Sequence, residues 1–182
     1  YTAVAIFQLI DRGVISLDAP ITHYLPQFVP LDESGNPVKV SIQHLLSHQS
    51  GLPDFTFEMY KWLHAIDEPR VGETRMVNER LVDYRTVAWQ PGSESQYANI
   101  NFVLLGAVIE AVTGETYEDY VRQEILSPLN MQSTDFVYRE DMLGKAALGS
   151  QTHYSFYTMM VDLMGPEGGM DEFTEKMVGN TH

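Results

Sequence analysis

The sequence lacks cysteine altogether and has few basic residues. None of its 182 residues is Cys, which excludes a disulfide framework and a thiolate metal site. A chain without Cys folds equally well in oxidising or reducing surroundings, so the compartment stays open. The 11 Lys and Arg face 25 Asp and Glu, for a formal net charge of −14. Nucleic acids and anionic membranes attract clustered cations, so neither is an expected partner.

Long hydrophobic runs are also missing. The longest, such as 102–109, fall far short of the roughly 20 residues that span a bilayer, and no membrane segment is expected in this chain. The first residues include neither a Met nor a basic n-region, so they do not read as a signal peptide. We interpret residues 2–12 instead as a helix that is buried on nearly all sides and that ends at Gly13. We expect the sequence to begin part-way along this helix.

What the sequence does contain is enough apolar material for one domain with a real core. The hydrophobic fraction is 44%, and no repeat or linker interrupts the chain. Apolar periodicity and capping residues predict further helices after Ser41 and Thr116 and before Thr113-Gly114. The expected helices are 42–48, 76–84 with Leu81 and Val82 inward, 100–111, 117–126 and 171–177. Helix 100–111 should bury one face made of Ile100, Val103, Leu104, Ala107, Val108 and Ala111.

Two histidines stand one helical turn apart, at His44 and His48. This spacing can present two imidazoles to one metal ion, but a catalytic zinc site needs a third protein ligand and no Glu follows His44. The alternative is a capping or hydrogen-bonded structural role. We predict no metal and no cofactor. A second open choice concerns the aromatic-rich stretch 55–62, which either lines a substrate cleft or packs as a surface helix before a polar loop at 66–75.

The stretch 89–99 is the best candidate for a site. Pro91-Gly92 predicts a turn, and the triplet Tyr97-Ala98-Asn99 leads directly into the helix at 100–111. One interpretation makes Tyr97 and Asn99 functional side chains at the mouth of that helix. The other makes Tyr97 a packed aromatic and Asn99 the N-cap, because Asn is a leading N-cap residue. The two interpretations can coexist, since an N-cap side chain can also point into a cleft.

Four motifs follow one another along the chain. They are His44-Leu45-Leu46-Ser47-His48-Gln49-Ser50-Gly51-Leu52-Pro53, Trp89-x-Pro91-Gly92-Ser93-x3-Tyr97-Ala98-Asn99, Leu104-Leu105-Gly106-x2-Ile109-Glu110-x2-Thr113-Gly114 and Pro128-Leu129-Asn130-Met131-x2-Thr134. Together they resemble the serine β-lactamase family of class C type, which includes penicillin-binding-protein-like D,D-peptidases, D-aminopeptidases and esterases. Asn130 stands where a Gly is usual, and both residue types accept a left-handed backbone.

The resemblance implies an α+β fold of the β-lactamase/transpeptidase type, with a five-stranded antiparallel sheet beside a mainly helical subdomain. This chain would supply mostly the helical subdomain and few strands. We treat residues 1–182 as one partial β-lactamase-like domain, with a clear match over 1–149 and a weak match over 150–182. The remainder of the same fold is then a possible partner of the chain. The resemblance favours a periplasmic or secreted location, which the sequence itself leaves undetermined.

The resemblance also implies three catalytic elements. The first is a Ser-x-x-Lys whose Ser is the nucleophile, the second is Tyr-x-Asn, and the third is a Lys- or His-(Ser/Thr)-Gly triplet on a strand. Tyr97 and Asn99 match the second element, and we predict them as the catalytic residues. No Ser in the sequence is followed three residues later by Lys, and the third element is incomplete at His182. The helix at 2–12 resembles the continuation of the one that carries Ser-x-x-Lys.

The chemistry explains why such residues are needed. A serine hydroxyl becomes a nucleophile only when a neighbouring base takes its proton, and a tyrosine can do so if a cation such as Lys stands beside it. An Asn side chain offers both a donor and an acceptor to a Lys and a substrate amide. We therefore predict a serine hydrolase that acts through an acyl-enzyme on an ester, β-lactam or D-amino-acid peptide bond, here without its nucleophile segment. The alternative is a non-catalytic binding or structural module of the same fold.

Overall fold

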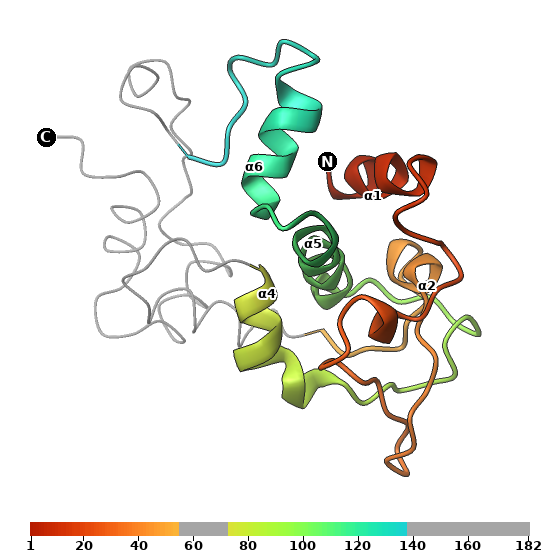
Figure 1. Ribbon diagram of the computed structural model, residues 1–182. Coiled ribbons are helices and arrows are strands. Elements are labelled where there is room, and N and C mark those ends of the chain that lie inside the picture. Colours follow the sequence, from red (N-terminus) through yellow and green to blue (C-terminus); the bar gives the residue numbers. More distant parts are fainter. Residues whose placement is uncertain (55–72, 138–182) are drawn as a thin grey trace, which may run out of the picture. The chain divides into compact units, whose positions relative to one another are not determined.

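Helices provide the regular secondary structure of the part of the chain that can be described. The computed structural model describes residues 1–54 and 73–137, which apart from Val137 fall in one compact unit (Figure 1). Over these residues no strand forms, and only three isolated β-bridges occur, Pro20 with Ser41, Leu31 with Pro37 and Leu31 with Thr86. The expectation of a mainly helical chain is confirmed for this part.

The elements follow the chain in a simple order. The α-helices are α1 Thr2–Asp11, α2 Ile42–Leu46, α4 Glu73–Met76, α5 Asn99–Thr113 and α6 Tyr117–Val121. The remaining helical segments are the 3₁₀ turns η1 Ile21–His23 and η3 Val82–Tyr84, and the π-helical turns η2 Val77–Leu81 and η4 Arg122–Leu126. Each π-helical turn directly continues the α-helix before it, so α4 with η2 and α6 with η4 are two longer helical rods.

Helix α5 is the central element of this unit. It contacts α1, α2, α4 and α6, and Figure 1 shows it between α4 on one side and α1 and α2 on the other. Because neighbours surround it, the prediction of a single buried face is wrong: Leu105 and Ile109 are also fully buried, whereas Ala111 is exposed. The buried residues of the helix are Ile100, Asn101, Leu104, Leu105, Gly106, Ala107, Val108 and Ile109.

Helix α1 is amphipathic, although the sequence predicts burial on nearly all sides. Ala5, Ile6 and Leu9 are buried, but Val4 and Phe7 remain 51% and 49% exposed. The apolar periodicity identifies the helix correctly, but in this structure only one of its faces is covered by described residues. Its end lies where the sequence predicts, with Gly13 in the left-handed region at φ 72°.

The predicted caps are confirmed. The Ser41 hydroxyl accepts from the backbone N–H of His44 at the start of α2, and the Thr116 hydroxyl accepts from the N–H of Asp119 at the start of α6. Gly114 ends α5 with φ 75°, and Asn130 takes the left-handed conformation, φ 55°, that its resemblance to a Gly position implies. Such signals act within one turn of the chain, which is why the sequence alone reveals them.

Helix α2 ends earlier than predicted. It stops at Leu46, and His48 is a left-handed residue with φ 55°, so the predicted helical end at His48 is wrong. A left-handed residue cannot continue a right-handed helix. His44 and His48 therefore do not form the i, i+4 pair of one helix.

The helical segment at 73–84 begins earlier than predicted, and one of the two side chains predicted to be buried is exposed. The chain is already helical at Glu73, within the expected loop 66–75. Leu81 is fully buried as predicted, but Val82 is 37% exposed, so its inward placement is wrong. The π-helical turn at Val77–Leu81 has more residues per turn than an α-helix, and it therefore changes which side chains face the core.

Some predictions fall outside the described residues. They are the aromatic stretch 55–62, the part of the polar loop from 66 to 72, the helix 171–177 and His182. Within the described ranges no single helix meets the length and hydropathy of a membrane span; α5 together with α6 and η4 does so as a pair, but the pair is bent by 81°.

Candidate active site

The triplet Tyr97-Ala98-Asn99 lies at the first turn of the central helix. Ala98 is the N-cap of α5 and has an extended backbone, with φ −148° and ψ 129°. Ala98 itself is buried, but the Tyr97 side chain is 66% exposed. The extended N-cap thus places the side chains of Tyr97 and Asn99 at the start of the helix. The Ala98 residue between them is buried.

The two functional candidates contact each other. The Tyr97 phenol donates a hydrogen bond to Asn99 Oδ1 at 3.0 Å. The Nδ2 of the same Asn99 amide donates to Asp54 Oδ1 at 3.3 Å. The backbone N–H of Asn99 donates to the same carboxylate oxygen at 3.2 Å. The alternative in which Asn99 is the N-cap of the helix is therefore wrong. Asp54, from a distant segment, supplies the acceptor that an N-cap side chain would otherwise provide.

His48 lies directly beside the triplet. Its ring centroid is 4.6 Å from that of Tyr97 and 5.2 Å from that of Phe102, one turn into α5. Its Nδ1 accepts from the backbone N–H of Ala98 at 3.4 Å and lies 3.0 Å from Nδ2 of Asn101. The left-handed turn after α2 is what directs the imidazole toward the start of α5 rather than along α2.

The segments 47–51 and 88–98 run side by side, although some 40 residues separate them in the sequence. Backbone hydrogen bonds join the N–H of Gln96 to the carbonyl of His48, that of Gly92 to Gln49 and that of Ala88 to Gly51. At Gly51, with φ 76°, an added Cβ would meet the carbonyl oxygen of Trp89 at 2.8 Å. This close approach requires glycine, and it explains physically why the two motifs occur together.

The other histidine of the motif has a local structural role. His44 completes a capping box: its backbone N–H donates to Ser41 Oγ, and its Nδ1 accepts from the backbone N–H of Ser41, both at 3.3 Å. Burial, with a smaller contribution from the charge of Lys39, lowers the pKa of His44 below its ordinary value. His44 and His48 thus each use Nδ1 for a backbone N–H. Across 1–54 and 73–137 no group of three His, Cys, Asp or Glu side chains is placed to hold a metal.

The described residues place a carboxylate beside the triplet. The charged side chain recorded in contact with it is the Asp54 carboxylate, and the described ranges record no Lys or Arg contact with Tyr97. A phenol that is to accept a proton needs a neighbouring cation, since an opposite charge favours the ionised form. The described residues therefore provide the orientation of the phenol.

Sequence reasoning missed three residues around the triplet. Asp54 gave no signal beyond its place after Pro53, because its partner lies 45 residues further along the chain. Asn101 did give one: it is a polar residue among the apolar positions of helix α5, and it is fully buried. Its Oδ1 accepts from the hydroxyl of Ser50, also buried, at 2.6 Å. A buried amide in an apolar helix indicates a specific partner, because an unpaired one would be costly.

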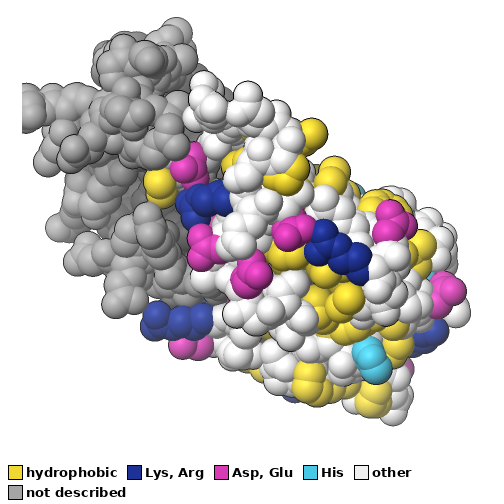
Figure 2. Space-filling view, turned by 45° about the horizontal axis from the view of Figure 1, so that its top comes forward, with side chains coloured by type: hydrophobic (Ala, Val, Ile, Leu, Met, Phe, Trp, Pro, Cys, Tyr) yellow, Lys and Arg dark blue, Asp and Glu magenta, His cyan; other side chains and the backbone are white. Residues whose placement is uncertain are grey.

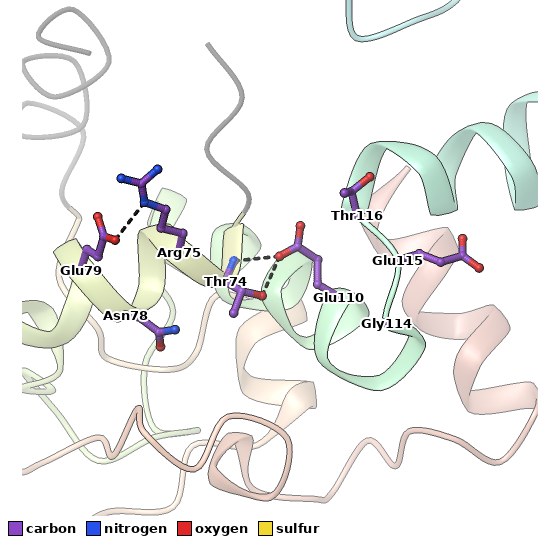
Figure 3. A pocket seen from close by; sticks show the side chains of 8 residues that line it. All are labelled: Thr74, Arg75, Asn78, Glu79, Glu110, Gly114, Glu115 and Thr116. Carbon is purple, nitrogen blue, oxygen red and sulfur yellow. Dashed lines mark hydrogen bonds and ion pairs between the residues drawn. The ribbon is translucent and has the colours of Figure 1, made fainter. Parts of the chain in front are cut away.

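A hollow lies at the C-terminal end of α5, whereas the triplet lies at its N-terminal end (Figure 3). Its lining residues are Thr74, Arg75, Asn78, Glu79, Glu110, Gly114, Glu115 and Thr116. The Glu110 carboxylate accepts from the backbone N–H and the hydroxyl of Thr74 at 2.8 and 2.6 Å, as Figure 3 shows, and from the N–H of Tyr117 at 3.2 Å. Eleven residues of helix separate Asn99 from Glu110, about 16 Å at about 1.5 Å per residue. This hollow is therefore separate from the triplet.

Comparisons with known proteins agree with the motif pattern. The β-lactamase family model matches residues 1–158. Among curated proteins, the esterase EstB of Burkholderia gladioli is 34% identical over 143 residues, which are 76% of this chain and 36% of the esterase. The chain thus spans about a third of the length of that relative.

Solved structures give the same result for the fold. A penicillin-binding protein of Bacillus halodurans matches with a TM-score of 0.61 at 30% identity, over 77% of this chain and 40% of that one. A D-stereospecific amidohydrolase of Streptomyces sp. matches with a TM-score of 0.58, also at 30% identity, over 72% and 40%. The expected fold class is confirmed: the described helices are part of a β-lactamase/transpeptidase-like fold. The chain belongs to the β-lactamase family.

Proposed function

We propose that the full-length protein is a serine hydrolase that forms an acyl-enzyme on an ester, β-lactam or D-amino-acid peptide bond, with Tyr97 and Asn99 in its active site. One observation carries the proposal. In a chain of the β-lactamase family, the largely exposed Tyr97 phenol donates to the half-buried Asn99 amide at 3.0 Å, at the mouth of a buried helix. Buried surroundings fix the backbone, while the two reactive side chains stay accessible to a substrate.

The reaction needs each group in a defined role. A serine oxygen attacks the carbonyl carbon of the substrate, and its proton passes to Tyr97 in its ionised form, which a neighbouring cation stabilises. The bond to the leaving alcohol or amine then breaks, and that group takes the proton from Tyr97. Water attacks the acyl-serine in the same manner and releases the acid. Asn99, with one donor and one acceptor on its amide, orients the phenol and the substrate.

The nucleophile lies outside these 182 residues in this proposal. No Ser-x-x-Lys occurs in the sequence, so the serine and the lysine that activates Tyr97 belong to another part of the full-length protein. The phenol now donates to Asn99 Oδ1, which is the geometry of a protonated tyrosine. On ionisation two acceptor oxygens would face each other. The Asn99 amide would then have to turn its Nδ2 toward the phenolate and away from Asp54.

The relatives favour esters and amides as the substrate class. The matched proteins include an esterase and an amidohydrolase described as D-stereospecific. A panel of p-nitrophenyl acetate, D-Ala-p-nitroanilide and nitrocefin separates esterase, peptidase and β-lactamase activity. We expect hydrolysis of the ester or the anilide to exceed that of nitrocefin.

A second candidate is a non-catalytic module that keeps the fold. Asp54 favours it, because its carboxylate accepts from both the backbone N–H and Nδ2 of Asn99, at 3.2 and 3.3 Å, and so occupies the amide group that would otherwise donate to a substrate. Such a module would bind a ligand at the triplet but would never form a covalent intermediate.

The decisive experiment treats the purified full-length protein with a fluorophosphonate probe and a fluorescent penicillin. The enzyme hypothesis predicts covalent labelling by at least one of them, located on one serine by peptide mass spectrometry. Denatured protein is the control for non-specific reaction. Absence of labelling in a folded full-length protein, or a full-length sequence without Ser-x-x-Lys, would leave the non-catalytic module as the function.

A further inference from the structure

His48 occupies a backbone conformation that few residue types accept. Its φ of 55° lies in the left-handed region, where the Cβ of a non-glycine residue comes too close to the following carbonyl oxygen. Gly51, in the same motif, also has a left-handed backbone. The chain uses glycine there, where the backbone of Trp89 leaves no room for a side chain. A non-glycine residue in this strained backbone conformation indicates that the contacts of its side chain are important.

The imidazole is held at one end of a directed chain of hydrogen bonds. The backbone N–H of Leu52 donates to Ser50 Oγ at 3.1 Å, so the Ser50 hydroxyl is free to donate its proton to Asn101 Oδ1, 2.6 Å away. This orients the Asn101 amide with Nδ2 toward His48 Nδ1, at 3.0 Å. Ser50 and Asn101 are both buried, so water does not compete for these partners.

The chain of bonds fixes the tautomer of His48. The N–H of Ala98 can only donate, and it points at the same Nδ1 at 3.4 Å, so Nδ1 must be an acceptor. In a neutral imidazole the proton then resides on Nε2. Two donors on one ring nitrogen also fix the plane of the ring, which a single contact would leave free to rotate.

The fixed ring in turn limits the freedom of Tyr97. The phenol is mostly exposed, and its recorded contacts in the described part are the 3.0 Å hydrogen bond to Asn99 and the His48 ring, 4.6 Å between centroids and tilted by 39°. Without the imidazole, only one side-chain hydrogen bond would hold a side chain that turns about two bonds. The backbone of the same segment is also joined to this turn, because the N–H of Gln96 donates to the carbonyl of His48.

We propose that His48 is a positioning residue for Tyr97, and that Ser50 and Asn101 hold it in the Nε2-protonated tautomer with its ring against the phenol. This inference rests on the proposed function, since it assigns His48 a part in the acylation that Tyr97 performs. His48 does not itself exchange protons with the substrate. It lowers the number of orientations that the phenol samples, and misplacement of a reacting group by about 1 Å can reduce a rate about 100-fold.

The test uses the full-length protein and three variants. His48→Phe keeps a ring but removes the acceptor, and Asn101→Leu removes the donor that orients His48. His44→Asn is the matched control, because it removes the other imidazole of the motif and weakens only the capping box of α2. We expect His48→Phe and Asn101→Leu to lower kcat for p-nitrophenyl acetate roughly 10- to 100-fold with little change in KM. The double variant should be no slower than the slower single one, because both act through one chain of contacts.

The control separates positioning from stability. His44→Asn should reduce the melting temperature but leave kcat unchanged. If kcat in His48→Phe stays at the wild-type level, or falls no further than in a control variant of equal melting temperature, the positioning role is wrong.

A measurement that needs no activity distinguishes failure of the positioning role from failure of the proposed function. In ¹⁵N NMR spectra of the full-length protein, His48 should show an unprotonated Nδ1 and a protonated Nε2. The Tyr97 ring signals should move in Asn101→Leu and not in His44→Asn. If the wild type never acylates, the proposed function fails, and the spectra alone decide the placement of Tyr97. A protonated Nδ1, or Tyr97 signals that do not move in Asn101→Leu, would overturn it.

Discussion

At the scale of single residues, this chain uses its two motif histidines in opposite ways. His44 turns back to its own helix and closes the capping box with Ser41, whereas His48 crosses to the start of α5 and meets Tyr97. Four residues separate them in the sequence, and the left-handed backbone at His48 accounts for the difference. A spacing that resembles a pair of metal ligands thus has two separate hydrogen-bonding uses.

His44 makes the stability of α2 depend on pH. Burial lowers its folded-state pKa below the unfolded value of about 6.5, so below that pH the unfolded chain binds the extra proton more readily than the folded one. Stability from this group is therefore complete above about pH 6.5 and falls as the pH drops toward the lowered folded-state value. Protonation of Nδ1 would also remove the acceptor for the Ser41 N–H.

The corresponding measurement compares melting temperatures of the wild type and His44→Gln at pH 7.5 and pH 5.5. A glutamine oxygen can accept from Ser41 but does not titrate, so the variant should lose less stability on acidification. All other residues are identical in the two proteins, so their contributions cancel in the comparison. Equal losses in the two proteins would show that His44 does not contribute to the pH dependence.

At the scale of secondary structure elements, one carboxylate holds three helices together. Glu110, near the end of α5, accepts from Thr74 at the start of α4 and from Tyr117 at the start of α6. The first N–H groups of a helix have no partner within it, and a nearby negative charge is also favourable there. Glu110 therefore does for two helices what an N-cap side chain does for one.

Glu110→Gln should destabilise the folded protein by about 1.5–3 kcal/mol, since hydrogen bonds to a charged group contribute in that range and the new amide NH₂ would face N–H donors. Glu79→Gln is the matched control, because its ion pair with Arg75 is exposed, with side chains 47% and 54% accessible. Exposed pairs contribute no more than about 1 kcal/mol. Urea unfolding of both variants measures the difference, and equal effects would contradict the linking role of Glu110.

The elements also show how far the sequence alone could lead. Ser41, Gly114 and Thr116 act on backbone groups within a turn of themselves, so helix ends there are predictable. The left-handed turn at His48 is not predictable, because histidine rarely adopts it and contacts with the distant residues Ala98 and Asn101 stabilise it. Burial around α5 likewise depends on which helices pack against it, and periodicity cannot give that.

The candidate site divides in the same manner. The Tyr97-Ala98-Asn99 triplet was identified from its sequence motif, and the structure brings its two polar side chains together. Asn101 could have been singled out as a polar residue in an apolar helix, but its partner Ser50 and the role of Asp54 could not, since each depends on contacts between residues 45 or more positions apart. The catalytic roles of Tyr97 and Asn99 themselves remain predictions that kinetics must test.

At the scale of the whole molecule, acidic residues outnumber basic ones, 25 to 11, and several described arginines pair with them. Among the described arginines, Arg12 pairs with Glu124, Arg75 with Glu79, and Arg122 with Asp119 and Asp135. Figure 2 shows basic side chains scattered over the visible face, next to acidic ones. Phosphate recognition needs several cations free to approach one another, and this face offers no such patch.

A chain with a net charge of −14 should therefore not bind nucleic acid. Duplex DNA and RNA should show no mobility shift with the 182-residue chain, even at 20 mM salt, where attraction to phosphates is strongest. A basic protein of similar length serves as the positive control for non-specific binding. A shift that weakens steeply as salt is added would contradict this expectation.

The central claim for the whole molecule is that Tyr97 takes part in acyl transfer. The most direct test is the intact mass of the full-length protein after brief exposure to an activated ester or a penicillin. The wild type and Tyr24→Phe, which loses a hydroxyl that only accepts from the Ser16 backbone in the described structure, should gain the mass of one acyl group. Tyr97→Phe should gain none, or acylate at least about 100-fold more slowly, as expected when a proton-transfer group is lost. Acylation of Tyr97→Phe at the wild-type rate would contradict the account.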